Sequence, residues 1–163
     1  METANMQFSD LVRPECIIDN LVADTRQAAL RAMATRLVDD GYCKPSFVEA
    51  ILERERVHPS GLPMAGHKIA IPHTDAEHVE RSTILFARLA APVEFLSMGS
   101  PDETLQIQMI SMFALKEKQR IGDMLETLLS VYQHDEVLDR LLHAPDAGQM
   151  FATLQRAVIE YGS

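Results

Sequence analysis

The chain has 163 residues, of which 47% are apolar and 24% charged, so it is long enough to bury the core of one ordinary domain without disulfide or metal staples. Its net charge of −9 excludes a nucleic-acid-binding surface, which would need clustered Lys and Arg. No apolar run approaches the roughly 20 residues that cross a bilayer, so direct membrane insertion is not expected.

The N-terminal segment and the cysteines indicate where the protein works. The segment METANMQFSD has neither the basic nor the apolar region of a signal peptide, so we expect a cytoplasmic protein. Cys16 and Cys43 match no metal-binding spacing, and we expect both to be reduced thiols in the core. No linker or internal repeat divides the chain, so residues 1–163 are predicted to form a single domain with its core between about residues 8 and 160.

The first third of the chain predicts one short strand and two helices. Cys16–Ile18 is an apolar run typical of a strand, and Asp24 is expected to cap a helix that ends at Gly41. Ser46 and Glu49 have the spacing of a capping box and predict the start of a second helix. The apolar faces of the two helices are predicted to consist of Leu30, Met33, Leu37 and Val38 in the first and Phe47, Val48, Ile51 and Leu52 in the second.

The middle of the chain changes to the periodicity of strands, and the last third returns to that of helices. Strands are predicted at residues 69–71, 82–90, 93–95 and 105–115. In the last of these, Leu105, Ile107 and Met109 alternate with Gln106 and Gln108. Helices are predicted at residues 121–128, 136–142 and 147–159. This order predicts an α/β fold, a single domain with a mixed β-sheet flanked by helices.

A histidine follows directly after one of these strands, in the stretch IAIPH. Pro72 cannot donate to a strand ladder and has a fixed φ, so it ends the strand and holds His73 in a defined direction. A neutral imidazole presented in this way can attack phosphorus and carry a phosphoryl group as a covalent phosphoramidate, without a metal or organic cofactor. Thr74 and the backbone N–H groups after Pro72 could donate hydrogen bonds to the phosphoryl oxygens. The alternative interpretation is an ordinary histidine in a surface loop.

Phosphoryl transfer also requires a cation, and the LERER end of the second helix supplies candidates. At about 100° per residue, Arg54 lies at one edge of the apolar face, where a guanidinium could bind an anion bidentately. Arg56 points further toward solvent, and Glu55 projects nearer the middle of the apolar face, where it could orient one of the arginines. Alternatively, Arg54 could complement the helix dipole and lay its aliphatic stem on the surface.

Three histidines, His67, His73 and His78, leave a metal site open as an alternative, because imidazole is the commonest ligand of transition metals. Their spacing does not favour such a site, since His73 and His78 are five residues apart and His67 lies on the far side of the predicted strand. We therefore expect no metal, and a metal-dependent hydrolase on these histidines is kept as an alternative function.

The segment from Leu52 to His73, LERERVHPSGLPMAGHKIAIPH, resembles the active-site segment of the fructose/mannitol-type EIIA domains of the bacterial sugar phosphotransferase system. Its long loop, together with Thr74, most resembles the galactitol-type branch. The resemblance implies a phosphoryl carrier that accepts phosphate from the phosphocarrier protein HPr on His73. The carrier then donates the group to a cysteine of a cognate EIIB and acts through it with a membrane EIIC. Arg54 matches the arginine that assists this transfer in the family.

The chain departs from the family pattern at one position. Many mannitol- and fructose-type members have a second active-site histidine at the start of the helix after the last long strand, where this chain reads LKEKQRIGDML. Gln119, or alternatively Arg120, is expected to take that place and to bind phosphate. Leu62, Pro63 and Met64, in the loop before the histidine strand, are candidates for an apolar surface that docks the protein partners, and ordinary packing of the loop is the alternative for each of them.

Two further functions stay open at this point. EIIA-like domains of the nitrogen-related branch share the IAIPH strand end and act by phosphorylation-dependent protein binding rather than in sugar uptake. The chain could also be a structural adaptor in which His73 is never modified. We expect the sugar-transport role, because of the long loop at 61–67 and the missing second histidine, and the transported sugar does not follow from this chain.

Overall fold

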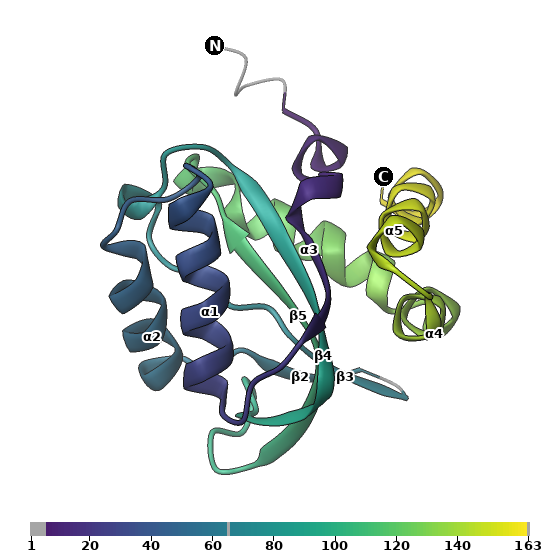
Figure 1. Ribbon diagram of the computed structural model, residues 1–163, viewed down its shortest axis with the longest axis horizontal. Coiled ribbons are helices and arrows are strands. Elements are labelled where there is room, and N and C mark those ends of the chain that lie inside the picture. Colours follow the sequence, from purple (N-terminus) through teal and green to yellow (C-terminus); the bar gives the residue numbers. More distant parts are fainter. Residues whose placement is uncertain (1–5, 65, 163) are drawn as a thin grey trace.

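The computed structural model describes residues 6–64 and 66–162, which form a five-stranded mixed sheet with helices on both of its faces (Figure 1). The strands are β1 (Ile17–Leu21), β2 (Gly61–Met64), β3 (His67–Ala70), β4 (Thr83–Leu96) and β5 (Thr104–Ala114). The helices are α1 (Arg26–Asp39), α2 (Phe47–Val57), α3 (Ile121–Tyr132), α4 (Asp135–His143) and α5 (Ala147–Tyr161). Short 3-10 turns include η2 (Phe8–Leu11), η3 (Pro14–Cys16), η4 (Ala76–His78) and η5 (Lys118–Arg120).

The strands lie side by side in the order β1-β4-β5-β3-β2. The β1–β4 and β3–β5 pairs are parallel, and the β4–β5 and β2–β3 pairs are antiparallel. The parallel pairing places the carboxyl ends of β3 and β5 next to each other at one edge of the sheet. The prediction of a single α/β domain with a mixed sheet flanked by helices is confirmed.

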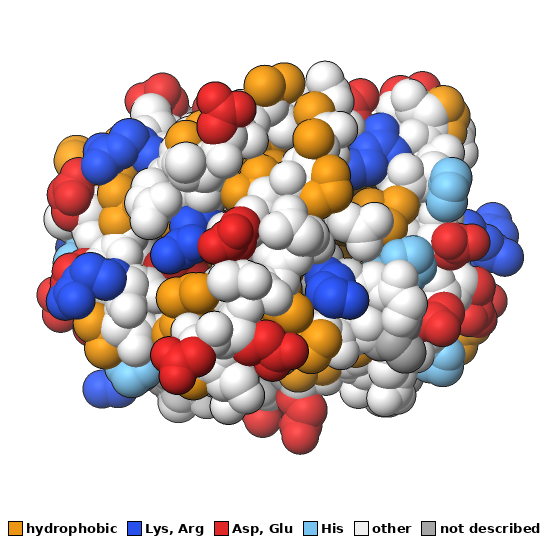
Figure 2. All heavy atoms as spheres, turned by 90° about the horizontal axis from the view of Figure 1, so that it is seen from below, with side chains coloured by type: hydrophobic (Ala, Val, Ile, Leu, Met, Phe, Trp, Pro, Cys, Tyr) orange, Lys and Arg blue, Asp and Glu red, His pale blue; other side chains and the backbone are white. Residues whose placement is uncertain are grey.

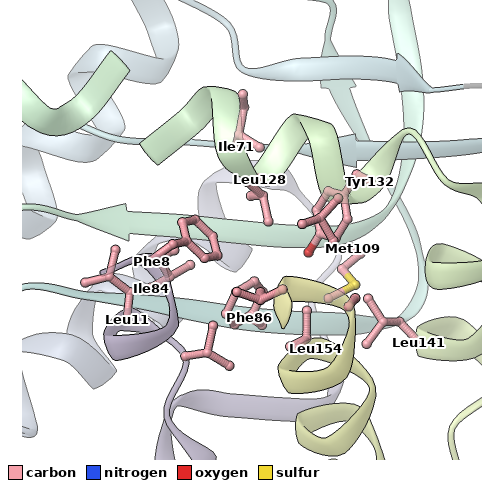
Figure 3. Close-up of a cluster of buried hydrophobic side chains, with 14 of the residues drawn as sticks. Phe8, Leu11, Ile71, Ile84, Phe86, Met109, Leu128, Tyr132, Leu141 and Leu154 are labelled. Atoms are coloured by element: carbon pink, nitrogen blue, oxygen red, sulfur yellow. The ribbon is translucent and has the colours of Figure 1, made fainter. Parts of the chain in front are cut away.

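The sheet separates two hydrophobic clusters. The first cluster lies under α1 and α2 and contains the apolar faces predicted for both helices, with Phe47 and Ile51 of α2 fully buried. The second lies under α3, α4 and α5 on the opposite face (Figure 1). Figure 3 shows part of this second cluster, where Ile71, the residue after β3, packs among side chains that include Leu128 of α3. The residue that precedes the Pro-His pair is thus anchored in the core.

The distribution of charged side chains and the state of the two cysteines agree with the expectations from the sequence. On the face shown in Figure 2, Lys and Arg side chains are interspersed with Asp and Glu, and no basic patch forms there. Cys16 and Cys43 are buried free thiols, as predicted. Among residues 6–64 and 66–162, no helix combines the length and apolar character that crossing a bilayer requires.

The capping residues predicted for the first two helices are wrong in detail. Thr25 rather than Asp24 caps α1, because the Thr25 hydroxyl accepts a hydrogen bond from a backbone N–H in the first turn of α1 at 3.1 Å. α2 begins after Ser46 as predicted, but the capping box is absent. The Ser46 hydroxyl lies 2.8 Å from Nδ1 of His78, and Glu49 forms an ion pair with an arginine of α1. Both side chains are used for contacts to distant parts of the chain, which spacing alone does not reveal.

The loop predicted before the histidine strand contains an additional strand, β2. Pro63 weakens the sequence signal for a strand, but β2 is at the edge of the sheet, where a missing N–H is tolerated. Leu62 and Met64 are half-buried and pack on the second cluster, and only Pro63 is exposed. Met64 pairs with His67 at the end of the hairpin that is remote from the exit of β3. The prediction that these three residues form an exposed docking surface near His73 is therefore wrong.

The two strands predicted at 82–90 and 93–95 form one strand, β4, with a shift of register against β5 between Arg88 and Val93. The shift is a bulge that inserts extra residues on β4. At the same place the side chains of β5 change sides of the sheet. Ile107 packs in the first cluster, whereas Met109, two residues later, packs in the second. The predicted alternation therefore holds only up to this irregularity.

Candidate active site

The segment that leaves β3 carries His73 and is held on both sides by backbone hydrogen bonds. The Ile71 N–H donates to the Ser60 carbonyl oxygen at 3.1 Å, and the Phe113 N–H of β5 donates to the Pro72 carbonyl oxygen at 2.9 Å. The Ile71 side chain is buried (Figure 3). His73 therefore follows a strand end that its neighbours fix in place, at the carboxyl ends of the parallel strands, where α/β sheets bind ligands.

The two ring nitrogens of His73 have different partners. Nδ1 lies 3.4 Å from the Ile71 carbonyl oxygen, which can only accept a hydrogen bond, so Nδ1 carries the proton. Nε2 is then unprotonated and lies 3.5 Å from Nη2 of Arg54. Long contacts of this kind are common in catalytic sites before a substrate binds. The arrangement presents a nucleophilic nitrogen directly beside a cation.

The surroundings of His73 favour the neutral imidazole. Burial is the largest effect and lowers its pKa. The hydrogen bond to the Ile71 carbonyl acts in the opposite direction, and the positive charge of Arg54 lowers the pKa further. The net shift is downward, so the half-buried ring is neutral at pH 7, and only the neutral ring can attack an electrophile through Nε2.

Arg54 comes from the last turn of α2, and its guanidinium has no acidic partner among residues 6–64 and 66–162. Arg56, two residues further, points to solvent as predicted and pairs with Glu53 at 2.6 Å. The half-buried Arg54 is therefore free to bind an anion beside His73, whereas the charge of Arg56 is already neutralised.

Glu55 does not orient either arginine, so that expectation is wrong. Its side chain is buried, and its two carboxylate oxygens accept hydrogen bonds from the backbone N–H and the hydroxyl of Ser60, at 2.9 and 2.7 Å. Burial raises the pKa of Glu55, and the two hydrogen bonds from Ser60 oppose this shift. Glu55 thus connects the last turn of α2 to the residue that precedes β2.

A cavity of about 280 Å³ lies beside His73 and Arg54. Its apolar wall includes Met98, which is 43% exposed, and Leu125 of α3. Met98 reaches this place because its N–H donates to the Gly61 carbonyl oxygen at 2.8 Å. A Cβ at position 61 would lie 2.6 Å from a carbonyl oxygen of β4, so only glycine permits this close approach. The cavity is lined by Arg54, Glu55, His58, Pro59, Ser60, Pro72, His73, Met98 and Leu125.

A second, larger groove of about 530 Å³ lies between α4 and α5. Its polar lining includes Arg140 and Arg156 but contains neither histidine nor cysteine. Because it offers no nucleophile for phosphoryl transfer, the smaller cavity at His73 is the better candidate for the active site.

The two predicted phosphate-binding residues lie outside the lining of this cavity. Thr74 is buried directly after His73, and no hydrogen bond to another described residue occupies its hydroxyl. Gln119 is exposed in η5 and is not among the residues that line the cavity. The structure therefore brings together His73 and Arg54 and keeps Thr74 adjacent in the chain, while Gln119 lies in η5 outside the lining of the cavity.

His58 is a cavity residue that the sequence prediction missed. It ends α2, and its N–H donates to the Arg54 carbonyl oxygen at 2.7 Å. The available signal was its position four residues after Arg54, which places the two side chains on one face of the helix end. Its positive charge, when present, contributes to the lowered pKa of His73.

The three histidines considered for a metal site do not meet. His67 lies 3.7 Å from Asp139 of α4, and His78 contacts Ser46. His73 lies by Arg54 instead. Within the described ranges, no group of three or more His, Cys, Asp or Glu side chains is arranged to hold a metal ion.

A family model described as "Phosphoenolpyruvate-dependent sugar phosphotransferase system, EIIA 2" matches residues 10–157. The chain belongs to this EIIA family. The resemblance to fructose/mannitol-type EIIA domains is thereby confirmed, because the match covers nearly the whole chain and does not depend on the IAIPH segment alone.

Relatives of this EIIA chain include transport and regulatory proteins. Multiphosphoryl transfer protein 2 of Escherichia coli is 34% identical over 155 residues, which are 91% of this chain and 17% of that protein. A nitrogen regulatory protein of Bradyrhizobium diazoefficiens is 35% identical over 98 residues, 59% of this chain and 62% of that protein. A galactitol-specific EIIA component of Escherichia coli is 23% identical over 121 residues, 74% and 80% of the two chains. The EIIA chain thus spans less than two thirds of the first two relatives.

The fold of this EIIA chain is also found among solved structures. The crystal structure of IIA mannitol from Escherichia coli superposes with a TM-score of 0.72 at 25% identity, over 87% of this chain and 97% of that one. This coverage agrees with the mixed α/β fold described above.

The lowered pKa predicts how His73 titrates. We expect its midpoint below the ordinary value of 6.5, so the neutral ring is lost only as the pH falls below about that value. In the window between the folded and unfolded pKa values the folded state binds fewer protons, and stability therefore decreases there as the pH is lowered. A proton NMR titration of the His73 ring measures the midpoint, and a value at or above 6.5 would contradict the burial described here.

Proposed function

We propose that this EIIA chain is a phosphoryl carrier that accepts phosphate from phospho-HPr on His73 and donates it to a cysteine of a cognate EIIB during sugar uptake. The observation that carries the proposal is the 3.5 Å contact between Nε2 of His73 and the guanidinium of Arg54, which has no acidic partner in the described part of the chain. Membership of the EIIA family supports a phosphotransferase role. The proposed reaction needs no metal or organic cofactor.

In the first step, Nε2 of His73 attacks phosphorus in line with the bond to the donor. A nitrogen–phosphorus bond forms, the bond between phosphorus and the donor breaks, and the donor keeps the electron pair. Arg54 binds the phosphoryl oxygens and offsets part of their charge of about −2. The proton stays on Nδ1, and the Ile71 carbonyl oxygen stabilises the positive charge that the ring acquires.

In the second step, a thiolate of EIIB attacks the same phosphorus and the electron pair returns to Nε2. Thr74 is proposed to donate its free hydroxyl to a phosphoryl oxygen. Gln119, which is exposed in η5, is proposed as a second donor to the phosphoryl oxygens.

Both partners must reach one phosphorus atom, which requires a shallow site with an exposed apolar rim. Met98 and Val57, which are 43% and 51% exposed, and the half-buried Leu125 are the residues proposed for this rim. HPr and EIIB would then use the same surface in turn, and the membrane EIIC would be reached only through EIIB. This scheme places the chain in the cytoplasm.

A regulatory role is the second candidate function. The observation that favours it is the 35% identity to a nitrogen regulatory protein over 98 residues. In that role the same phosphorylation would switch the binding of another protein. Transfer of the phosphoryl group from His73 to the cysteine of a sugar-specific EIIB distinguishes the two, because only the transport role requires it.

The first test is the intact mass after incubation with phosphoenolpyruvate, enzyme I and HPr at alkaline pH. We expect one added phosphoryl group that is labile in acid, and none on His73→Gln, whose amide is not nucleophilic. Circular dichroism serves to verify that the variant is folded. If the wild-type chain gains no mass while HPr is charged in the same tube, the chain is not a phosphoryl carrier.

The second test concerns Arg54→Lys, which keeps the charge but lacks the planar fork that binds two oxygens. We expect phosphoryl acceptance to slow by roughly tenfold or more, because the phosphoryl group is positioned less well. Arg56→Lys on the same helix is the matched control, since its partner is Glu53 on the surface. Equal transfer rates for the two variants would mean that Arg54 has only a structural role.

A further inference from the structure

The last turn of α2 reaches both nitrogens of the His73 ring. Arg54 contacts Nε2 directly at 3.5 Å. The next residue, Glu55, is connected to Nδ1 through Ser60 and Ile71. Consecutive residues of one helix turn therefore act on opposite sides of the nucleophile, one by contact and one through the backbone.

The connection from Glu55 consists of four hydrogen bonds. Its carboxylate accepts from the Ser60 N–H at 2.9 Å and from the Ser60 hydroxyl at 2.7 Å. The Ser60 carbonyl oxygen accepts from the Ile71 N–H at 3.1 Å. The Ile71 carbonyl oxygen accepts from Nδ1 of His73 at 3.4 Å. No link in this connection depends on a mobile surface side chain, because Glu55, Ser60 and Ile71 are all buried.

The burial of Glu55 is unusual for a carboxylate. It is only 6% exposed, and no ion pair or hydrogen bond other than those to Ser60 satisfies it among residues 6–64 and 66–162. Burying a carboxylate is unfavourable unless its oxygens are well paired, and an apolar residue would fit an apolar helix face better. Its presence next to Arg54 points to a role in the site.

We propose that Glu55 is a positioning residue for phosphoryl transfer, which holds Ser60 and the Ile71 peptide group so that the His73 proton stays on Nδ1 and the lone pair on Nε2. The rate effect rests on the phosphoryl-carrier function proposed above. The effect on the ring itself does not, because it is a property of the unphosphorylated protein.

The variants separate a hydrogen-bonding role from a charge effect or a general loss of packing. Glu55→Ala removes both acceptors. Glu55→Gln keeps the shape, and its amide can accept from the Ser60 N–H and donate to the Ser60 hydroxyl, so it should rescue. Glu53→Ala is the control, since Glu53 lies on the surface of the same helix and pairs with Arg56.

The first readout is the tautomer of His73 in the unphosphorylated protein, from long-range proton–nitrogen NMR spectra of the ring. We expect the Nδ1–H form to dominate in the wild type, in Glu55→Gln and in Glu53→Ala, and the Nε2–H form to gain population in Glu55→Ala. A wild-type ring that is mainly Nε2–H would overturn the proposal, and so would a Glu55→Gln ring that behaves like the alanine variant.

The second readout is the rate of phosphoryl acceptance from phospho-HPr. We expect Glu55→Ala to slow it by about tenfold or more, because the nucleophile is misdirected, and Glu55→Gln and Glu53→Ala to stay close to wild type. A folded Glu55→Ala protein with wild-type tautomer and rate overturns the inference but leaves the carrier function intact. If the wild type accepts no phosphate while the tautomers change as expected, the carrier function fails and the positioning role stands.

Should Glu55→Ala not fold, Ser60→Ala takes its place. It removes one hydroxyl and keeps the Ser60 N–H bonded to Glu55, so we expect a smaller change of tautomer in the same direction. A wild-type tautomer population in this variant overturns the proposal.

Discussion

The orientation of His73 depends on the peptide groups of Ile71 and Pro72, which continue the sheet past the end of β3. One of their hydrogen bonds joins the segment to Ser60 before β2, and the other joins it to Phe113 of β5. The Ile71 carbonyl oxygen is left for the histidine ring. Because Pro72 has no N–H, the ladder cannot continue at that residue. The chain turns away there, and the next side chain is presented beside Arg54.

The cation in the site lacks the carboxylate partner that a neighbouring arginine has on the surface. Arg56 is neutralised by Glu53, whereas the half-buried Arg54 has no carboxylate partner in the part of the chain that the structure describes. His73 is kept neutral mainly by burial. The partial burial of an unpaired guanidinium is unfavourable for stability, and the burial of His73 becomes unfavourable as the pH falls below its ordinary pKa. Departures of this kind are expected where a site must bind an anion that arrives later.

The sequence predicted the local parts of the site and missed those made by long-range contacts. His73 follows from Pro72 at a strand end, and Arg54 from its angle on α2. The strand β2 was missed because Pro63 breaks the strand signal, although an edge strand tolerates it. The partner of Glu55 is in a loop that helical geometry does not describe, so a contact to an arginine was expected instead. The position of Gln119 depends on how η5 packs, and no spacing rule determines it.

The proposed chemistry stands or falls on which nitrogen of His73 carries the phosphoryl group. Nitrogen and phosphorus NMR of the phosphorylated, nitrogen-15-labelled protein identifies which ring nitrogen is modified. The account predicts phosphorus on Nε2, with the proton on Nδ1 still held by the Ile71 carbonyl oxygen. Phosphorus on Nδ1 would contradict it, because that nitrogen would first have to give up its hydrogen bond to the Ile71 carbonyl oxygen, and it is Nε2 that lies beside Arg54.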